Sequence, residues 1–357
     1  MTRIVALAMF LGGTLVSLGG DAAADGPAAG GPVAGGPVAG GPADGVRLRR
    51  SRDDDTTRVF KLLGKNAIWQ HVQTISLPWP TFHTQGLVKI GDVFFVSAVE
   101  VLEPRVSNGA VTDTLYDFSI DRSAGAGRGW LFEFDSSGAL LGKVELTAGD
   151  AYHPGGIDFD GRDLWVPVCE YRPNSRSNIY RVDPETLEAE LVFSEADAIG
   201  GIVKNRHGGT LHGVSWGSRR LWTWEIEPRQ GRRPPRVSAP GSWEPNPQFY
   251  VDYQDCHYHG VEYMLCGGVA SYATPRGAIA FGGLDLVDLR RGRMEHQIPV
   301  NAFIDEGSGP NPTLSLAHNA FWVEPTAGGD ALRFYFMTES DNQAELVVYD
   351  VTPWINR

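Results

Sequence analysis

His153-Pro-Gly-Gly-Ile157 is the stretch that decides the fold, because related segments recur along the chain. They are His83-Thr-Gln-Gly-Leu87, Ala198-Ile-Gly-Gly-Ile202, His257-Tyr-His-Gly-Val261 and His318-Asn-Ala-Phe-Trp322. In chain order, the first four segments have a glycine three residues after their first position and a branched apolar residue next. Internal repeats with a period of about 40–50 residues are typical of a propeller.

Strand-like runs surround each of these segments. The runs that precede them alternate in polarity and cover Val72–Leu77, Gly142–Leu146, Ala189–Phe193, Gln248–Asp252 and His296–Val300. The apolar runs that follow cover Val93–Val99, Leu164–Cys169, Leu211–Trp216, Met264–Ala270 and Leu332–Met337. Third strands follow, such as Trp130–Phe134, Asn178–Val182 and Leu221–Glu225, and Gly, Asp and Asn separate the strands as hairpin turns require.

Five repeats of four short strands predict an all-β fold, a five-bladed β-propeller. The run Val72–Leu77 has no blade before it, and the last repeat ends after its third strand, at Leu346–Val351. We therefore expect the N-terminal strand to complete the last blade and close the ring.

The chain divides into three parts. Residues 1–24 have the features of a signal peptide, with Arg3, the apolar run Ile4–Leu18 and the small residues Ala22–Ala24, so we expect a secreted, extracellular protein. Residues 25–57 are a Gly/Pro/Ala-rich segment that cannot form a core, which predicts a disordered linker. Residues 58–357 form the propeller.

Composition limits the partners. The formal charge of −12 argues against nucleic acid and against an anionic membrane surface, and a small-molecule substrate is the partner we expect. The oligomeric state stays open. In an exported protein Cys256 and Cys266 can form a disulfide, which leaves Cys169 as a buried free thiol.

The four histidines His83, His153, His257 and His318 share the first position of their repeats. This position begins the innermost strand of each blade, so we expect the four side chains to meet at one mouth of the central channel. Neutral imidazoles that converge there suit a divalent transition metal, either iron, copper or zinc. Ala198 leaves the fifth side open for water or substrate. Two alternatives stay open: His259 in place of His257, and a ring of hydrogen-bonded histidines without metal.

Three glutamates support a site at this mouth. Glu100 and Glu170 each follow their histidine by 17 residues, and Glu339 ends the corresponding strand of the last repeat. The second strand of a blade returns to the face where the first begins. The carboxylates are therefore candidates to orient the metal ligands or to transfer protons. The connection 102–129 in blade one lies on the same face and is either a lid or a disordered insertion.

Phe82-His-Thr-Gln-Gly-Leu87 followed by Glu100 resembles the plant-type glutaminyl cyclase family, whose five-bladed propellers carry a Phe-Thr-Gln-Gly-Leu motif. The resemblance implies an acyl-transfer reaction with Glu100 as acid and base. The chain as a whole resembles exported bacterial and fungal propellers. Several histidines around a propeller axis, backed by glutamate, are also similar to carotenoid oxygenases.

The function that we predict is a secreted metal-dependent enzyme, an oxidoreductase that acts on a small organic substrate. One alternative is a glutaminyl-cyclase-like acyltransferase that uses Glu100. A second is a non-catalytic propeller that binds a protein or a glycan on the same face. The sequence does not identify the substrate.

Overall fold

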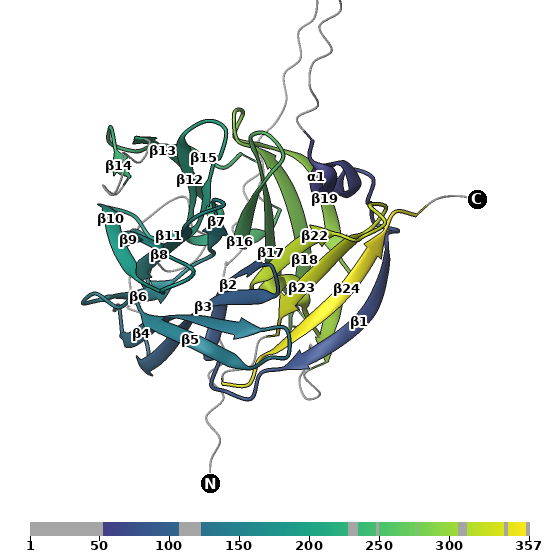
Figure 1. Ribbon diagram of the computed structural model, residues 1–357, viewed down its shortest axis with the longest axis horizontal. Helices are drawn as coiled ribbons and strands as arrows, with labels where there is room; N and C mark the ends of the chain where they lie inside the picture. Colours follow the sequence, from purple (N-terminus) through teal and green to yellow (C-terminus); the bar gives the residue numbers. More distant parts are fainter. Residues whose placement is uncertain are drawn as a thin grey trace, which may run out of the picture.

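The computed structural model describes residues 53–106, 123–227, 235–247, 250–275, 277–305, 313–338 and 342–354. Five antiparallel sheets surround a common axis, as Figure 1 shows. The prediction of an all-β five-bladed propeller is confirmed. The signal peptide predicted at residues 1–24 lies outside the described residues. Within the described residues, no helix is long and apolar enough to cross a membrane.

Each blade has its first strand next to the axis. From the axis outwards, blade 1 contains β2 (His83–Ile90), β3 (Val93–Glu103), β4 (Ala126–Asp135) and β5 (Leu140–Glu145). Blade 2 contains β6 (Ala151–Pro154) and β7 (Asp158–Phe159) as two parts of one inner strand, then β8 (Leu164–Glu170), β9 (Ser177–Val182) and β10 (Ala189–Glu195). Blade 3 contains β11 (Ile199–Lys204), β12 (Thr210–Ser215) and β13 (Arg220–Glu227), with β14 (Arg236–Val237) and β15 (Ser242–Pro245) both paired to β13.

Blades 4 and 5 follow the same plan. Blade 4 contains β16 (Asp252–His259), β17 (Tyr263–Thr274), β18 (Gly277–Asp288) and β19 (Arg293–Val300). Blade 5 contains β22 (Phe321–Pro325), β23 (Leu332–Met337), β24 (Glu345–Thr352) and β1 (Ile68–Ser76). Smaller elements are the helix α1 (Asp55–Phe60), the 3₁₀ turns η1 (Trp216–Ser218) and η2 (Leu316–His318), and the pair β20 (Phe303–Asp305) and β21 (Thr313–Ser315).

The ring is closed by the N-terminal strand. β1 pairs antiparallel with β24 from Ile68↔Thr352 to Ser76↔Glu345, and Figure 1 shows the two strands side by side. The predicted closure is therefore confirmed. α1 begins at Asp55 and so crosses the boundary that the sequence placed between residues 57 and 58. The fourth strand of blade 3 differs from the prediction, because β14 and β15 occupy the position expected for Gln248–Asp252. The inner strands of blades 4 and 5 also begin elsewhere, β16 at Asp252 and β22 at Phe321.

Burial follows the position of a strand in its blade. β8 is buried at every residue, whereas the outer strand β5 alternates between exposed and partly buried residues. Strands covered on both faces are apolar throughout, and strands half open to water alternate. This contrast is the pattern that made the repeats visible in the sequence.

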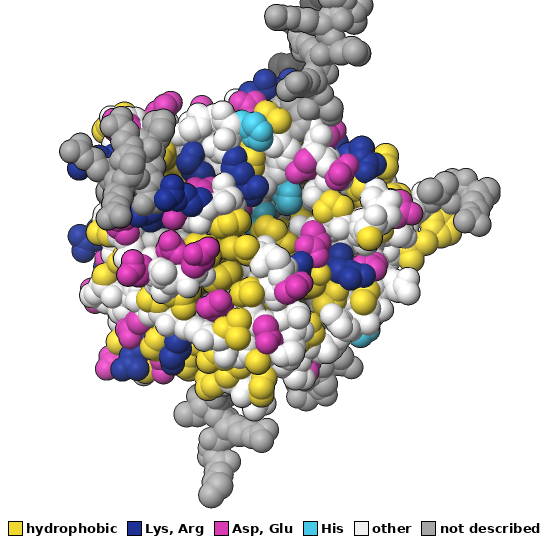
Figure 2. Space-filling view, in the orientation of Figure 1, with side chains coloured by type: hydrophobic (Ala, Val, Ile, Leu, Met, Phe, Trp, Pro, Cys, Tyr) yellow, Lys and Arg dark blue, Asp and Glu magenta, His cyan; other side chains and the backbone are white. Residues whose placement is uncertain are grey.

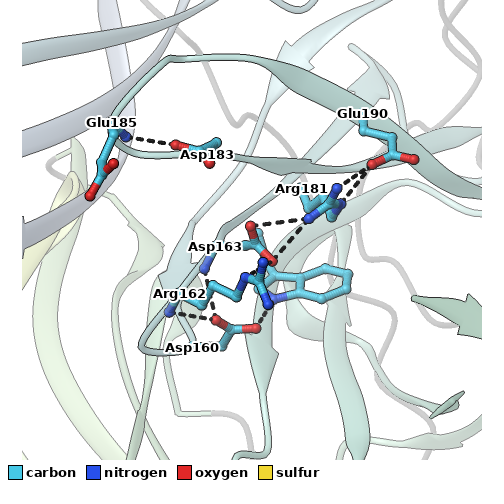
Figure 3. Close-up of polar contacts among 8 residues, drawn as sticks. Asp160, Arg162, Asp163, Arg181, Asp183, Glu185 and Glu190 are labelled. Atoms are coloured by element: carbon cyan, nitrogen blue, oxygen red, sulfur yellow. Dashed lines mark hydrogen bonds and ion pairs between the residues drawn. The ribbon is translucent and has the colours of Figure 1, made fainter. Parts of the chain in front are cut away.

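Short polar networks fix the hairpin turns, and Figure 3 shows one in blade 2. Asp160 accepts hydrogen bonds from the backbone N–H groups of Arg162 and Asp163, both at 2.9 Å, and from the indole N–H of Trp165 at 2.9 Å. Arg181 on β9 then links Asp163 to Glu190 on β10. An Asp side chain that accepts hydrogen bonds from nearby backbone N–H groups stabilises a tight turn.

Glycines let the inner strands approach each other at the axis. A Cβ atom on Gly86 would lie 2.6 Å from the backbone nitrogen of Ile157, and one on Gly155 would lie 2.2 Å from the carbonyl oxygen of Gly200. Gly156 donates to Gly200 at 2.8 Å, which joins blade 2 to blade 3. The glycines here therefore reflect the close approach of backbones from neighbouring blades at the axis.

Blade 4 has Asp255 at this glycine position, and its carboxylate joins several blades. It accepts hydrogen bonds from the backbone N–H groups of Leu87 at 2.9 Å, Ile157 at 3.1 Å and Phe321 at 3.3 Å. These donors belong to blades 1, 2 and 5. Asp255 is fully buried, so each bond forms away from water, where a lost partner is costly.

We expect Asp255→Ala to lower the free energy of unfolding by about 3 kcal/mol or more, because three buried N–H groups lose their acceptor. Urea unfolding measures this loss, and the isosteric Asp255→Asn variant is expected to lose less. Asp150→Ala, which removes an exposed carboxylate, is the control. A loss below about 1 kcal/mol for Asp255→Ala would contradict the role given to this carboxylate.

Candidate functional site

His83 and His153 lie at the same mouth of the channel. Each lies three residues before its axial glycine, Gly86 or Gly156, at the beginning of the innermost strand of its blade. His83 is half-buried and His153 is buried. The two rings are close enough that the charge of His83 affects the pKa of His153. The register predicted for these two histidines agrees with the structure.

His257 lies in a different place. The bulge between Tyr253 and Asp255 in β16 matches the bulge between Thr84 and Gly86 in β2, so Asp252 is the residue that corresponds to His83. The position assigned to His257 from the sequence is therefore five residues too late. Its ring is fully buried inside the propeller and does not reach the mouth.

Two aspartates face the His257 ring. Its Nε2 lies 3.4 Å from the Asp255 carboxylate and donates to the carbonyl oxygen of Phe321 at 2.7 Å, while its Nδ1 lies 3.9 Å from Asp158. Burial alone lowers the pKa of His257, but the carboxylates of Asp255 and Asp158 raise it to about 9. We call Asp158, Asp255 and His257 the axial network. The imidazole ring of His257 is therefore a cation at neutral pH, and a protonated imidazole does not bind metal.

The other predicted residues are dispersed. His318 ends the 3₁₀ turn η2, one residue beyond the position that corresponds to His83, and its Nδ1 lies 3.2 Å from the Asn319 side-chain oxygen. Glu100 accepts from the indole N–H of Trp130 at 3.0 Å. Glu170 forms an ion pair with Arg172 at 2.6 Å. Glu339 lies outside the described residues.

The alternative ligand His259 is the last residue of β16 and lies 3.6 Å from Asp54. No group of three or more His, Cys, Asp or Glu side chains among the described residues is arranged to hold a metal ion. The four-histidine centre is therefore not assembled there, and metal binding at His83 and His153 stays a prediction.

The predicted disulfide is present between Cys256 and Cys266 on neighbouring strands, and Cys169 is a buried free thiol.

Aromatic and basic side chains surround His153. Its ring stacks on Tyr171 with centroids 4.0 Å apart, and Trp216 lies 5.8 Å from it. The guanidinium of Arg105 covers Tyr171, with its Cζ atom 3.5 Å from the ring centroid. We call His83, His153, Tyr171, Trp216 and Arg105 the His153 cluster. It joins blades 1, 2 and 3 at the mouth.

Burial keeps His153 neutral. The pKa of its imidazole is well below the usual value because of burial first and the charges of His83 and Arg105 second. Burial also raises the pKa of the Cys169 thiol to about 12, and its Sγ lies 3.8 Å from Nδ1 of His153. At neutral pH the cluster thus combines an uncharged imidazole and an unreactive thiol with the cation of Arg105.

Arg105, Tyr171 and Trp216 were not predicted from the sequence. All three follow directly after, or shortly after, the second strand of a blade, the connection that we placed on this face. Arg105 belongs to the connection 102–129, of which residues 107–122 lie outside the described residues. An aromatic residue just beyond the second strand in two consecutive blades was the available signal.

Figure 2 shows the charges on one face of the molecule. Histidine side chains lie near its centre, with basic and acidic side chains interspersed around them and hydrophobic groups between. Among the described residues visible on this face, charges of both signs are mixed.

The model of DUF6454, a family of unknown function, matches residues 53–353. No curated protein matches the chain at a significant level. Among solved structures, Kuenenia stuttgartiensis hydrazine synthase is 13% identical, with a TM-score of 0.34, over 74% of this chain and 58% of that chain. The chain thus spans less than two thirds of that protein.

Two smaller proteins also match. The periplasmic gluconolactonase of Pseudomonas aeruginosa is 15% identical, with a TM-score of 0.35, over 75% of this chain and 88% of that chain. A luciferin-regenerating enzyme is 9% identical, with a TM-score of 0.43, over 80% of this chain and 95% of that chain. Similarities this low carry no functional information.

The raised pKa of His257 predicts a pH effect on stability. The folded value of about 9 exceeds the unfolded value of about 6.5, so this stabilisation is complete below pH ~6.5 and is lost as the pH rises through ~9. Urea unfolding at several pH values across this range should show a falling free energy of unfolding in the wild type and a flatter profile in His257→Gln. Equal slopes for the two proteins would show that His257 is not charged in the folded state.

Proposed function

This chain belongs to the DUF6454 family, and we propose that it binds a small organic anion at the mouth of the propeller, with Arg105 as the principal contact. The observation that carries the proposal is the stack of His153, Tyr171 and Arg105. It places a cation at the mouth in a fixed position.

Tyr171 orients the guanidinium without using its hydrogen bonds. A guanidinium stacked on an aromatic ring contacts it with its flat face, so the N–H groups at its edge stay available for a ligand. Trp216 lies 6.0 Å from Arg105 and adds a second ring beside it. A planar group of the ligand can contact Trp216 while its carboxylate meets Arg105.

The charges nearby favour Arg105 over its neighbours. The other arginines around the mouth are paired: Arg172 with Glu170, Arg219 with Asp252 and Arg220 with Asp197. Within the part of the chain that the structure describes, no carboxylate pairs with Arg105. A carboxylate group of a ligand would therefore pair with Arg105 as the protein's own carboxylates pair with the neighbouring arginines.

We expect Arg105→Ala to weaken binding of an organic anion by about 10-fold or more, because a hydrogen bond to a charged group contributes roughly 1.5–3 kcal/mol. Benzoate and gluconate are the probes, one planar and one polyhydroxylated, and titration calorimetry is the measurement. The matched control is Arg162→Ala, which removes an exposed arginine at the turn shown in Figure 3. Equal affinities for Arg105→Ala and the wild type, or no binding of either anion, would refute the proposal.

A second candidate function is the metal-dependent enzyme expected from the sequence, at the same mouth. The supporting observation is that His83 and His153 lie at the same mouth and that His153 is neutral, the form in which imidazole binds metal. These two residues would hold iron, copper or zinc, which would act as a Lewis acid or redox centre toward the bound anion. A third ligand is not among the described residues.

Metal analysis of untagged protein tests this second function. We expect about one transition metal ion per chain, lost in His153→Ala and retained in His71→Ala, because His71 is exposed on the outer strand β1. A substoichiometric metal content that does not change in His153→Ala would exclude this function.

A further inference from the structure

A cavity lies away from the mouth, between blades 3 and 4. It has a volume of about 290 Å³ and is bounded by β13 and β15 on one side and by the turn between β18 and β19 on the other. We call it the blade 3–4 groove. Residues that the axial network and the His153 cluster do not use line it.

The two walls of the groove differ in chemistry. The blade 3 wall has the hydroxyls of Thr223 and Ser242 and the carboxylate of Glu244, beside the ring of Trp243. The blade 4 wall has the apolar side chains of Met264, Val287 and Leu289, followed by the basic residues of the turn between β18 and β19. Trp243 is 44% exposed, and its ring lies beside the core residue Trp222, with centroids 6.5 Å apart.

Charges of both signs lie at the opening. Arg290 forms an ion pair with Glu262 at 2.9 Å, and Arg291 and Glu244 line the cavity as a further donor and acceptor. The positive charge of Arg291 and the negative charge of Glu244 cancel, so this pair gives the opening no net charge. A ligand with both hydroxyl donors and hydroxyl acceptors fits such a pair better than an anion does.

The floor of the groove is rigid and uncharged. His212 is held by the hydroxyls of Thr210 at 2.9 Å and Thr223 at 3.1 Å, one on each ring nitrogen. Burial and the charge of Lys204 lower its pKa to about 4, so the ring stays neutral at physiological pH. A neutral floor of fixed geometry suits an uncharged ligand.

We propose that the blade 3–4 groove binds a neutral saccharide. The exposed ring of Trp243 and the apolar side chains of the blade 4 wall fit the C–H faces of a sugar ring, and the hydroxyls, Glu244 and Arg291 fit its edge. The volume is at the lower end of the range for ligand pockets, so one or two sugar rings enter and a longer chain would extend beyond the opening. Arg220, whose Cζ lies 5.1 Å from the Trp243 ring centroid, supports the ring from one side.

The test uses the folded chain and three neutral disaccharides, cellobiose, lactose and maltose. Saturation-transfer NMR identifies which of them contacts the protein, and a titration gives its Kd, expected in the millimolar range. Trp243→Ala is expected to weaken binding about 10-fold or more, and Arg291→Ala several-fold. Trp354→Ala is the control, since Trp354 is 56% exposed and lies at the end of blade 5.

Two results would overturn the proposal: no saturation by any of the three sugars at concentrations up to about 20 mM, or unchanged affinity in Trp243→Ala. Circular dichroism confirms that each variant is folded; Arg291→Ala changes an exposed side chain and serves as the test if Trp243→Ala unfolds. Arg105→Ala should bind the sugar as the wild type does. Failure of the anion site and failure of the saccharide site are thus distinguishable.

Discussion

One carboxylate, that of Asp255, determines how the five blades meet. The inner strands converge closely at the axis, with glycine at the axial position in blades 1, 2 and 3, and backbone N–H groups of neighbouring blades reach the Asp255 carboxylate. Asp255 accepts from three of these neighbours, and Asp158 accepts from the backbone of Lys204 in blade 3 at 3.2 Å. Between the two carboxylates lies the positively charged ring of His257. The axial network therefore touches every blade and fills the channel with polar contacts.

This filled axis explains why the candidate ligand sites lie at the periphery of the channel. The His153 cluster assembles above the axial network, where loops from three blades bring an arginine and aromatic rings to the mouth. The blade 3–4 groove opens on the flank, where two blades diverge. In the His153 cluster the connecting loops provide the arginine and the aromatic rings, whereas in the groove the polar and aromatic side chains of blade 3 lie on β13 and β15.

The fold could be predicted from the sequence because two physical constraints repeat with the blades. Strand alternation marks the outer strands, and axial crowding places Gly86, Gly156 and Gly201 at one position in their repeats. The glycine rule, however, placed the inner strand of blade 4 at the wrong residues. Gly260 lies three residues after His257 and imitates the repeat, but it belongs to the turn after β16 and has a φ of 56°. The true axial residue there is Asp255, which replaces the glycine and so conceals the repeat.

The site was predictable only in part. His83 and His153 follow from the repeat, whereas Arg105, Tyr171 and Trp216 lie in connections that have no periodicity.

Amide hydrogen exchange tests the role of Asp255 in joining the blades most directly, because it reports on the N–H groups that the Asp255 carboxylate binds. The N–H groups of Leu87, Ile157 and Phe321 should exchange only through global unfolding, with the slowest rates in the protein. Exchange of these three groups faster than that of the outer strands, such as β5 and β10, would contradict the account.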